Sequence, residues 1–410
     1  MLLTACSGAQ PGGDRVLIPT PRPVRTPDAG QNTGTPKPGP SPTAVVGVIE
    51  SDRIPPLDVS MREWRTTNFR RYVGNPLDIK PGGPGKDGIL PIYQPKFVSI
   101  ADAETWDWMT PTHPVAVLAL KGEARAYPLG ILTMHEVVND IVGGEPVLVT
   151  YCPLCYTSIG FKRTVDGKPL VFGTTGNLKN SNLLMWDDQT ESWWQQATGE
   201  AIIGDMAGKR LEFLPVFTTS LAEFKEVYPS GKVLSRDSVS FEYRAYYGLT
   251  PYIGYDAPNN HPFLYQGRVD QRLSPMERLM VVERGQAVMA FPFTYLAQQR
   301  VAQTTIEGQP VVVFWEKGTL SALDKQEIEQ SKDVGSAGAF DSTVEGKVFT
   351  FRAEGEAIKD QETGSTWTVL GKAVSGPLAG TQLRPLGGKD GLWFVWVAFR
   401  PDIQIYRPAA

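Results

Sequence analysis

The sequence predicts a mainly β fold of the α+β kind, made of two tandem β-rich repeats with a few short helices. Three observations support this prediction. Short apolar segments alternate with turns that contain glycine. Helical periodicity is confined to brief stretches. A unit of about 120 residues occurs twice, and this period is too long for a solenoid. The second copy is degenerate, because it lacks polar residues that the first copy contains.

The repeat is clearest in two segments that align without a gap. Residues 126–147 read AYPLGILTMHEVVNDIVGGEPV, and residues 290–311 read AFPFTYLAQQRVAQTTIEGQPV. Matches resume further along the chain, where three segments of the first copy answer three of the second: 165–168 and 344–347, 189–194 and 362–367, and 204–208 and 376–380. We therefore expect a first repeat over residues 46–235 and a second over 276–410. An ordered crossover rich in tyrosine, residues 236–275, joins them.

The individual elements of the first repeat follow from local patterns. Residues 115–127 read as a hairpin that turns at Lys121 and Gly122. Residues 131–142 carry apolar side chains at helical spacing and predict a helix. Residues 145–150 predict a strand. Residues 159–173 predict a second hairpin with Asp-Gly at its turn. Ser220 precedes an apolar helical pattern that ends at Pro229, which predicts a short helix with a serine cap.

The N-terminus indicates an exported lipoprotein. Residues 1–6 end in Leu-Thr-Ala-Cys, which fits a lipobox whose Cys6 becomes acylated, although the charged part of a signal peptide is missing. Residues 7–45 are rich in Pro, Thr and Gly and have no apolar periodicity. Such a segment behaves as a disordered tether. We therefore expect an extracytoplasmic protein of the cell envelope, whose partner is the membrane that holds its lipid.

Composition excludes several classes of function. The formal net charge is −4 and no basic block occurs, so nucleic acid is not an expected partner. Neither a phosphate-binding loop nor a Gly-x-Ser-x-Gly motif is present in context. Asp187 and Asp188 are adjacent in sequence and point to opposite faces if the chain is extended there, which weakens a glycosidase interpretation.

The concentrated chemistry of this chain lies in Tyr-Cys-Pro-Leu-Cys, residues 151–155, directly after the predicted strand. Cys152 and Cys155 are the only cysteines besides Cys6. Two thiols on a turn can bind a metal, exchange electrons or form a structural disulfide. Two residues between the cysteines make a small loop, so a disulfide there would stabilise the fold only modestly. All three possibilities remain open at this point.

Comparison of the two copies singles out companions for the thiols. His135 is replaced by Gln299 in the second copy, Cys152 by Glu316 and Cys155 by Thr319. We therefore predict a site made of Cys152, Cys155 and His135, which binds a transition metal, with copper favoured, or performs catalytic thiol redox chemistry. In the alternative, this is a non-catalytic envelope or binding protein with an inert disulfide. Five polar residues are expected around the site: Asn139, Asp140, Asn182, Asp187 and Gln195.

The run from Ala126 to Cys155, together with FGTTGNLKNSNLLMWDDQTESWWQQ at 172–196, resembles an uncharacterised prokaryotic family, domain-of-unknown-function family thirty-one seventy-nine. The resemblance implies an exported or membrane-associated protein. Some relatives are labelled as selenoproteins, which implies a chemically active motif cysteine. The resemblance also implies that the following residues match positions of the family's motif: His135-Glu136, Asn139-Asp140, Cys152, Cys155, Asn180-Ser181, Asp187, Thr190, Ser192, Trp194 and Gln195. One departure is Tyr156-Thr157-Ser158, where the family more often has Gly-Thr-Ala.

Overall fold

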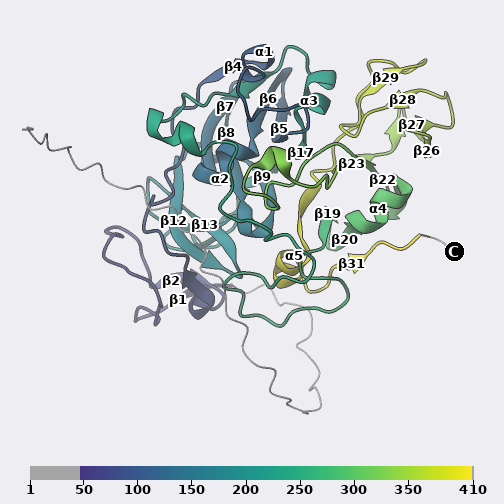
Figure 1. Cartoon of the computed structure of the whole chain (residues 1–410). Coiled ribbons are helices and arrows are strands. Elements are labelled where there is room, and N and C mark those ends of the chain that lie inside the picture. Colours follow the sequence, from purple (N-terminus) through teal and green to yellow (C-terminus); the bar gives the residue numbers. More distant parts are fainter. Residues whose placement is uncertain (1–46, 409–410) are drawn as a thin grey trace, which may run out of the picture.

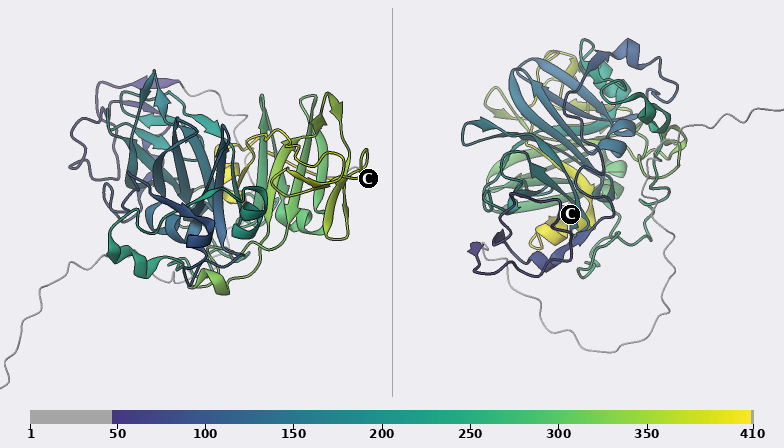
Figure 2. Two further views of the ribbon diagram at one scale, coloured as in Figure 1. Left: turned by 90° about the horizontal axis from the view of Figure 1, so that it is seen from above. Right: turned by 90° about the vertical axis from the view of Figure 1, so that its left-hand side faces the viewer.

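The computed structural model describes residues 47–408, and the fold over these residues is mainly β. Two β-rich halves lie side by side, the first in blue and teal and the second in green and yellow (Figures 1 and 2). The predicted lipobox with Cys6 and the predicted tether lie outside the described residues. Among the described residues, no helix has both the length and the apolar character needed to cross a bilayer.

The described residues of the first half form four sheets, which have seven, four, five and two strands. Their strands, in sheet order, are β1 (Val48–Glu50), β2 (Arg71–Val73), β15 (Ala201–Ile203), β14 (Trp193–Gln195), β13 (Asn182–Asp187), β12 (Phe172–Lys179) and β3 (Ile79–Pro81); β16 (Glu212–Leu214), β9 (Thr157–Lys162), β8 (Glu145–Cys152) and β7 (Val137–Val142); β17 (Val216–Ser220), β5 (Pro114–Leu120), β6 (Glu123–Pro128), β18 (Lys232–Leu234) and β4 (Phe97–Ser99); and the pair β10 (Thr164–Val165) and β11 (Lys168–Pro169).

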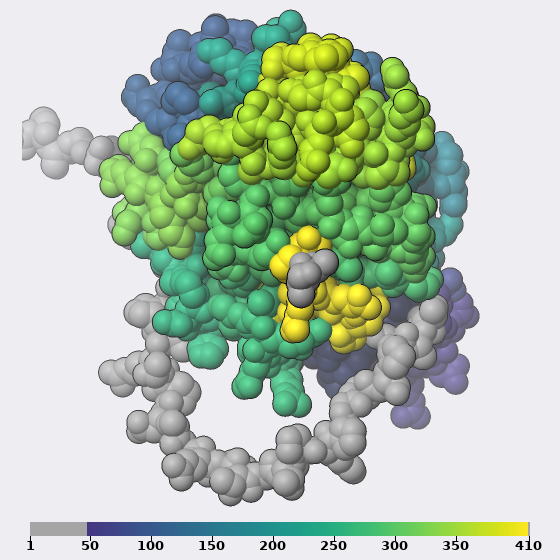
Figure 3. Space-filling model, turned by 90° about the vertical axis from the view of Figure 1, so that its right-hand side faces the viewer, coloured from purple at the N-terminus to yellow at the C-terminus, as the bar shows by residue number. Residues whose placement is uncertain are grey.

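The second half is built in the same manner. Its strands, in sheet order, are β30 (Lys389–Leu392), β19 (Arg278–Arg284), β20 (Ala287–Pro292) and β31 (Gln404–Ile405); β21 (Val301–Ile306), β22 (Gln309–Glu316) and β23 (Ser336–Asp341); β24 (Thr343–Val344) and β25 (Lys347–Val348); and β26 (Phe351–Glu354), β27 (Ala357–Asp360), β28 (Thr366–Trp367) and β29 (Ala373–Ser375). In the space-filling view of Figure 3, the yellow-green residues of this last sheet form the top of the face and green residues of the second half fill its centre.

Helices are short in both halves. They are α1 (Ile100–Ala103), α2 (Leu129–His135), α3 (Leu221–Val227), α4 (Phe293–Gln299) and α5 (Trp393–Phe399), with 3-10 turns η1 (Pro76–Asp78), η2 (Pro153–Cys155), η3 (Phe241–Tyr246) and η4 (Ile328–Gln330). The predicted serine cap is confirmed at α3. The Ser220 hydroxyl accepts a hydrogen bond from the Glu223 N–H, and the Glu223 carboxylate accepts one from the Ser220 N–H, which is a capping box.

The first predicted hairpin is confirmed as β5 and β6, which pair from Val115 with Pro128 to Leu120 with Glu123. Lys121 and Gly122 form the two-residue turn, with φ of 50° and 83°. Two successive positive φ angles are what a tight hairpin turn requires, because they match the twist of the strands. Glycine takes the second of these positions at no steric cost.

The predicted helix over 131–142 is wrong beyond His135. Helix α2 ends there because Glu136 adopts a φ of 56°, and the chain then continues as strand β7. The β-branched residues of 137–142 fit a strand better than a helix. They pair residue by residue with β8, from Val137 with Thr150 to Val142 with Glu145. The apolar spacing of this segment therefore arose from a short helix followed by a buried strand.

The second predicted hairpin, 159–173, is correct only at its turn. Asp166 and Gly167 have φ of 50° and 77° and join the short strands β10 and β11. Strands β9 and β12, which flank this turn, belong to different sheets. The turn therefore carries the chain from the sheet of the thiols to the sheet that packs beside it.

The two halves share one large core. Buried residues of this cluster come from the first half, such as Leu118 and Val149, and from the second half, such as Leu279 and Trp393. The crossover between the halves packs against the same cluster through tyrosines that include Tyr243. Element order also matches, since β5-β6-α2-β7-β8-β9 in one half answers β19-β20-α4-β21-β22-β23 in the other.

Candidate functional site

The two motif thiols lie on a turn that the local sequence explains. Strand β8 ends at Cys152, because Pro153 has no N–H for the sheet and begins the 3-10 turn η2. Tyr156 closes the turn with a φ of 53°, and its N–H donates to the Pro153 carbonyl at 3.1 Å. Both cysteines are free thiols, with 2% of Cys152 and none of Cys155 exposed. The predicted turn at a strand end is confirmed.

The surroundings of the two thiols shift their pKa values in opposite directions. Burial raises the pKa of Cys152, but hydrogen bonds from the Cys155 thiol and from the backbone N–H of Leu183 outweigh it and hold this pKa below its ordinary value. Burial raises the pKa of Cys155 well above its ordinary value, and the hydrogen bond to Cys152 raises it further. The pKa of Cys152 is thus lower than that of Cys155, the order that favours nucleophilic attack by Cys152.

Buried amides from β13 and the end of β14 support Cys155. The Asn182 side chain donates to the Cys155 sulfur at 3.3 Å and to the Gln196 side-chain oxygen at 2.8 Å. The Gln195 side chain donates to the Asn182 oxygen. Gln196 also accepts from the Thr157 hydroxyl at 3.0 Å. The structure therefore brings Asn182 into contact with a motif thiol and places Gln195 directly behind it.

Glu136 is the ionisable neighbour of the thiols. Its carbonyl accepts a hydrogen bond from the Tyr151 N–H at 2.8 Å, which fixes it beside the end of β8. The side chain is buried, and burial raises its pKa well above the ordinary value, with the charge of Cys152 raising it further. The second half shows the same proximity. There Arg300 ends α4 as Glu136 ends α2, and it forms an ion pair of 2.6 Å with Glu316, the last residue of β22.

A cavity of about 270 Å³ adjoins the thiol turn. Its walls come from the glycine-rich loop at 82–84, from strands β12 and β13, from Leu154 between the two cysteines, and from Tyr252 and Phe263 of the crossover. Glu136 lies in the wall, whereas neither cysteine does. Burial raises the pKa of Tyr252 well above its ordinary value, and the charges of Glu136 and Cys152 add to this effect.

His135 does not join the thiols. Its Nδ1 lies 2.6 Å from the Leu90 carbonyl oxygen and its Nε2 lies 2.8 Å from the Tyr247 hydroxyl, so both ring nitrogens are occupied. Burial lowers its pKa to about 4, which keeps the ring neutral. Within residues 47–408, no three His, Cys, Asp or Glu side chains gather closely enough to hold a metal ion. The structure therefore does not assemble the predicted set of Cys152, Cys155 and His135.

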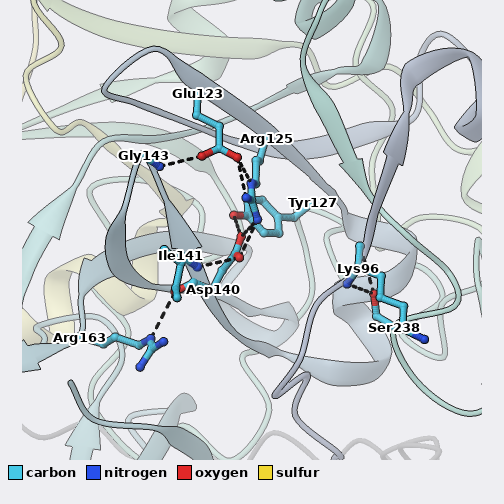
Figure 4. A network of polar contacts seen from close by, with 9 residues as sticks. All are labelled: Lys96, Glu123, Arg125, Tyr127, Asp140, Ile141, Gly143, Arg163 and Ser238. Atoms are coloured by element: carbon cyan, nitrogen blue, oxygen red, sulfur yellow. Dashed lines mark hydrogen bonds and ion pairs between the residues drawn. The ribbon is translucent and has the colours of Figure 1, made fainter.

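Asn139 and Asp140 serve the framework of the first half. The Asn139 side chain donates to the Phe172 carbonyl at 2.8 Å and accepts from the Phe172 N–H at 2.7 Å. Asp140 pairs with Arg125 at 2.7 Å and accepts from the Tyr127 hydroxyl at 2.6 Å (Figure 4). Burial raises the pKa of Asp140, although Tyr127 and Arg125 oppose this shift.

Asp187 is likewise held in a structural network. It accepts hydrogen bonds from the Trp194 ring N–H at 2.9 Å and from the Thr190 N–H at 2.8 Å. The second half repeats this arrangement, because Asp360 accepts from the Trp367 ring N–H at 2.9 Å. An identical network in the half without thiols indicates that Asp187 orders a turn.

Tyr156, which follows the second motif cysteine, ties the thiol turn to the second half. Its hydroxyl accepts from the Ala322 N–H at 3.0 Å, and the Arg278 guanidinium lies 4.3 Å from its ring centroid. Arg278 pairs in turn with Asp390 at 2.9 Å, with both side chains buried. The thiol turn is therefore packed between the two halves.

Sequence reasoning did not select Glu136, Gln196 or Tyr252 as site residues. A signal for Glu136 does exist in the repeat: positions 136 and 152 hold Glu and Cys in the first copy, and positions 300 and 316 hold Arg and Glu in the second. Both members of the pair change together, as expected for side chains in contact. Tyr252 lies in the crossover, which has no counterpart in the repeat and so offers no comparison.

A family model described as "Protein of unknown function (DUF3179)" matches residues 86–403, which include the thiol turn, Glu136 and most of the second half. The comparisons found no match among curated proteins or solved structures. Because the family model covers well over half of the chain, the protein belongs to the family DUF3179, as the resemblance of its motifs predicts.

Proposed function

We propose that this protein is a thiol redox protein in which Cys152 and Cys155 alternate between a dithiol and a disulfide. One observation carries the proposal: two free, buried thiols lie on one turn, and their surroundings lower the pKa of Cys152 and raise that of Cys155. This asymmetry is what thiol–disulfide exchange needs, with one nucleophile and one thiol that resolves the intermediate. In the second half, strand β22 ends without a thiol at Glu316, the position equivalent to Cys152, and residues 317–335 lead from there to β23 in place of the short thiol turn.

The reaction with a substrate disulfide balances as follows. The Cys152 thiolate attacks one substrate sulfur, forms a mixed disulfide and expels the other substrate sulfur as a thiolate, which takes the proton of Glu136. The Glu136 carboxylate then accepts the proton of Cys155. The Cys155 sulfur attacks the Cys152 sulfur, and the second substrate thiolate leaves. Two electrons pass to the substrate, and Glu136 ends protonated as it began.

Equilibration in glutathione redox buffers tests this proposal. Acid quenching, alkylation and mass spectrometry would count free thiols in the wild type and in Cys152→Ser and Cys155→Ser. We expect one two-electron transition in the wild type and a trapped mixed disulfide in Cys155→Ser only. A pair that stays oxidised under mild reductants would support the alternative, in which this is a non-catalytic envelope protein with an inert disulfide. A pair that never oxidises would exclude both.

Copper binding is a second proposal, supported by the chemistry of the thiols rather than by a complete ligand set. Thiolates select Cu(I) among transition metals, and Cys152 and Cys155 would be its ligands. His135 would need to leave both of its present hydrogen-bond partners to join them. Elemental analysis of protein purified without a His tag tests this proposal. Equal metal content in the wild type and in both serine variants would end it.

The location of the protein is a proposal that rests on its N-terminus. We propose that Cys6 carries lipid, that residues 7–45 are a tether, and that the folded part lies outside the cytoplasm on a membrane. The support is the Leu-Thr-Ala-Cys sequence followed by the Pro-rich segment. Incorporation of labelled palmitate into the native chain, and its loss in Cys6→Ser, is the expected result. Equal labelling of both chains would refute lipidation at Cys6.

We also propose that the two halves arose by tandem duplication and that only the first kept the site. The matching element order, the equivalent networks of Asp187 and Asp360, and the equivalent positions of Glu136 and Arg300 support this origin.

A further inference from the structure

We propose that the cavity beside the thiols binds an uncharged, mainly apolar ligand group that carries one hydrogen-bond acceptor. This inference rests on the proposed redox function, because it names the substrate class of the same site. A ligand seated there lies against Leu154, the residue between the two cysteines, and against Glu136. The cavity thereby holds a bound group against the turn that carries the two cysteines.

The walls of the cavity determine the apolar character of the ligand. Leu178 and Leu183 extend from strands β12 and β13, and Phe263 contributes an aromatic ring from the crossover. Glu136 is the only residue in the wall, among those the structure describes, with an ionisable carboxyl or amino group. A site of this kind, apolar with a few polar groups that converge, is the usual form of a small-molecule pocket.

Four side chains of the wall are polar: Glu136, Thr174, Asn177 and Tyr252. Thr174 donates to the Ile89 carbonyl and Asn177 to the Thr175 carbonyl, so Glu136 and Tyr252 are the donors left for a ligand. Glu136 is buried, and only burial and the charge of Cys152 act on its carboxyl group, without a hydrogen bond that would stabilise the carboxylate. A buried carboxyl group of this kind holds its proton and can donate it. The Tyr252 hydroxyl lies near the same groups and also donates when neutral. An anionic ligand would lose its hydration in a site of low polarity whose wall has no basic side chain, which disfavours it.

Two structural details indicate that the cavity is a designed space rather than a packing defect. Gly176 has a φ of 72°, and a Cβ atom there would lie 1.8 Å from the Pro84 carbonyl oxygen, so glycine is required at this point of the wall. The loop at 82–84 is thus held close to β12 by backbone contact, including a hydrogen bond of 2.8 Å from the Gly82 N–H to the Gly176 carbonyl. This loop and Phe263 of the crossover both line the cavity.

The test uses the full chain with both motif cysteines replaced by serine, so that binding is measured without thiol chemistry. The probes are 2-acetylnaphthalene, which is neutral and has one carbonyl acceptor, and 2-naphthoate, which has the same ring system and a negative charge. We expect 2-acetylnaphthalene to bind at least about tenfold more tightly, measured by fluorescence titration. Leu178→Trp, which fills the cavity, and Phe263→Ala, which removes a wall, should each weaken binding at least about fivefold.

The matched control is Leu77→Trp, a change at an exposed leucine that does not line the cavity, and it should leave binding unchanged. Equal affinity for the two probes, no binding of either, or unaltered binding in both cavity variants would overturn the inference. Wild-type redox equilibration is measured separately. Reversible oxidation without probe binding would refute the ligand class alone, whereas probe binding without reversible oxidation would refute the redox function on which it rests.

Discussion

At the scale of single residues, the chemistry of this protein depends on how differently its two thiols are solvated and hydrogen-bonded. The hydrogen bonds that Cys152 accepts favour its thiolate form. Cys155 is a buried thiol, and its sulfur accepts a hydrogen bond from the Asn182 side chain. The free energy of each contact is small. Together they decide which sulfur attacks and which resolves, because only a thiolate is an effective nucleophile.

The first residue-scale prediction concerns thiol reactivity against pH. Alkylation of Cys152 by iodoacetamide should titrate with a midpoint below that of an ordinary thiol, about 8.5. Cys155→Ser keeps a hydroxyl donor, whereas Cys155→Ala removes the donor, so the midpoint should rise in the alanine variant and stay low in the serine variant. Peptide mass spectrometry of timed samples measures both. Equal midpoints in all three proteins would show that Cys155 does not stabilise the thiolate.

A second prediction concerns His135 and the dependence of stability on pH. Burial lowers its folded-state pKa to about 4, against 6.5 for an ordinary histidine, so the unfolded chain binds the extra proton between these values. Stability from this residue is therefore complete above pH 6.5 and is lost as the pH falls toward 4. The free energy of unfolding should fall with decreasing pH by at most about 1.4 kcal/mol per pH unit because of this residue.

Urea unfolding between pH 4 and 7 measures this slope. His135→Gln introduces the residue found at the equivalent position 299 and should flatten the curve. His261→Gln, at an exposed histidine, is the control and should leave the slope unchanged. Parallel curves for the wild type and His135→Gln would contradict the assigned role of His135 as a buried neutral ring.

At the scale of secondary-structure elements, the two halves use chemically different side chains for the same connection. Asn139 on β7 holds both backbone groups of Phe172, and Gln303 on β21 donates to the Phe349 carbonyl at 2.9 Å and accepts from the Phe351 N–H at 2.7 Å. Each amide joins an edge strand of one sheet, β7 or β21, to the start of a strand in another, β12 or β26. The longer glutamine reaches two residues, Phe349 and Phe351, where the asparagine bonds to Phe172 alone.

This equivalence gives an element-scale prediction with an internal control. Asn139→Ala and Gln303→Ala should each lower the free energy of unfolding by about 1 to 3 kcal/mol, because each leaves backbone groups without a partner. Gln309→Ala, at an exposed position, should change it by less than about 0.5 kcal/mol. If Asn139→Ala abolished redox activity at wild-type stability, Asn139 would belong to the site instead of the framework.

Local patterns in the sequence were sufficient for elements that are specified within a few residues. The hairpin at Lys121-Gly122 and the capping box of Ser220 are set by turn and cap chemistry alone. The strand β7 was missed because its apolar residues continue the periodicity of α2, and only pairing with β8 distinguishes the two. Strands β9 and β12 belong to different sheets, and this assignment depends on contacts between residues distant in sequence, which no local pattern contains.

The site could be predicted in part for a related reason. The repeat comparison singles out Cys152 and Cys155 as thiols present in the first half alone, and the structure places the predicted neighbour Asn182 against Cys155. It misplaced His135, because loss of a residue from one copy marks structural substitutions as readily as functional ones. The position of Glu136 beside the end of β8 is signalled in the sequence only by the joint change at positions 136 and 152 between the two copies.

At the scale of the whole molecule, the thiol turn is part of the contact between the halves. Arg278 and Asp390 of the second half form a buried ion pair, Arg278 covers the ring of Tyr156, and the Ser158 N–H donates to Asp390 at 3.5 Å. One core cluster contains buried residues of both halves. We therefore expect the described part of the chain to unfold in a single transition that fluorescence and circular dichroism report at the same urea concentration.

The last prediction tests this coupling through the buried ion pair. Asp390→Asn keeps the shape of the side chain but leaves the Arg278 charge uncompensated between the halves, which should lower the free energy of unfolding by about 3 to 5 kcal/mol. Arg278→Met combined with Asp390→Leu removes both charges and should recover most of this loss, since an apolar pair has no desolvation cost. Arg352→Met, in an exposed pair with Glu354, should change stability by less than about 1 kcal/mol. Because Arg278 also lies over Tyr156, we expect the two halves of the Asp390→Asn protein to unfold in two separate urea transitions. The fluorescence of the first half's tryptophans would report one transition, and that of Trp367 in the second half would report the other. A single transition with unchanged stability would show that the halves are joined by their apolar core and not by this pair.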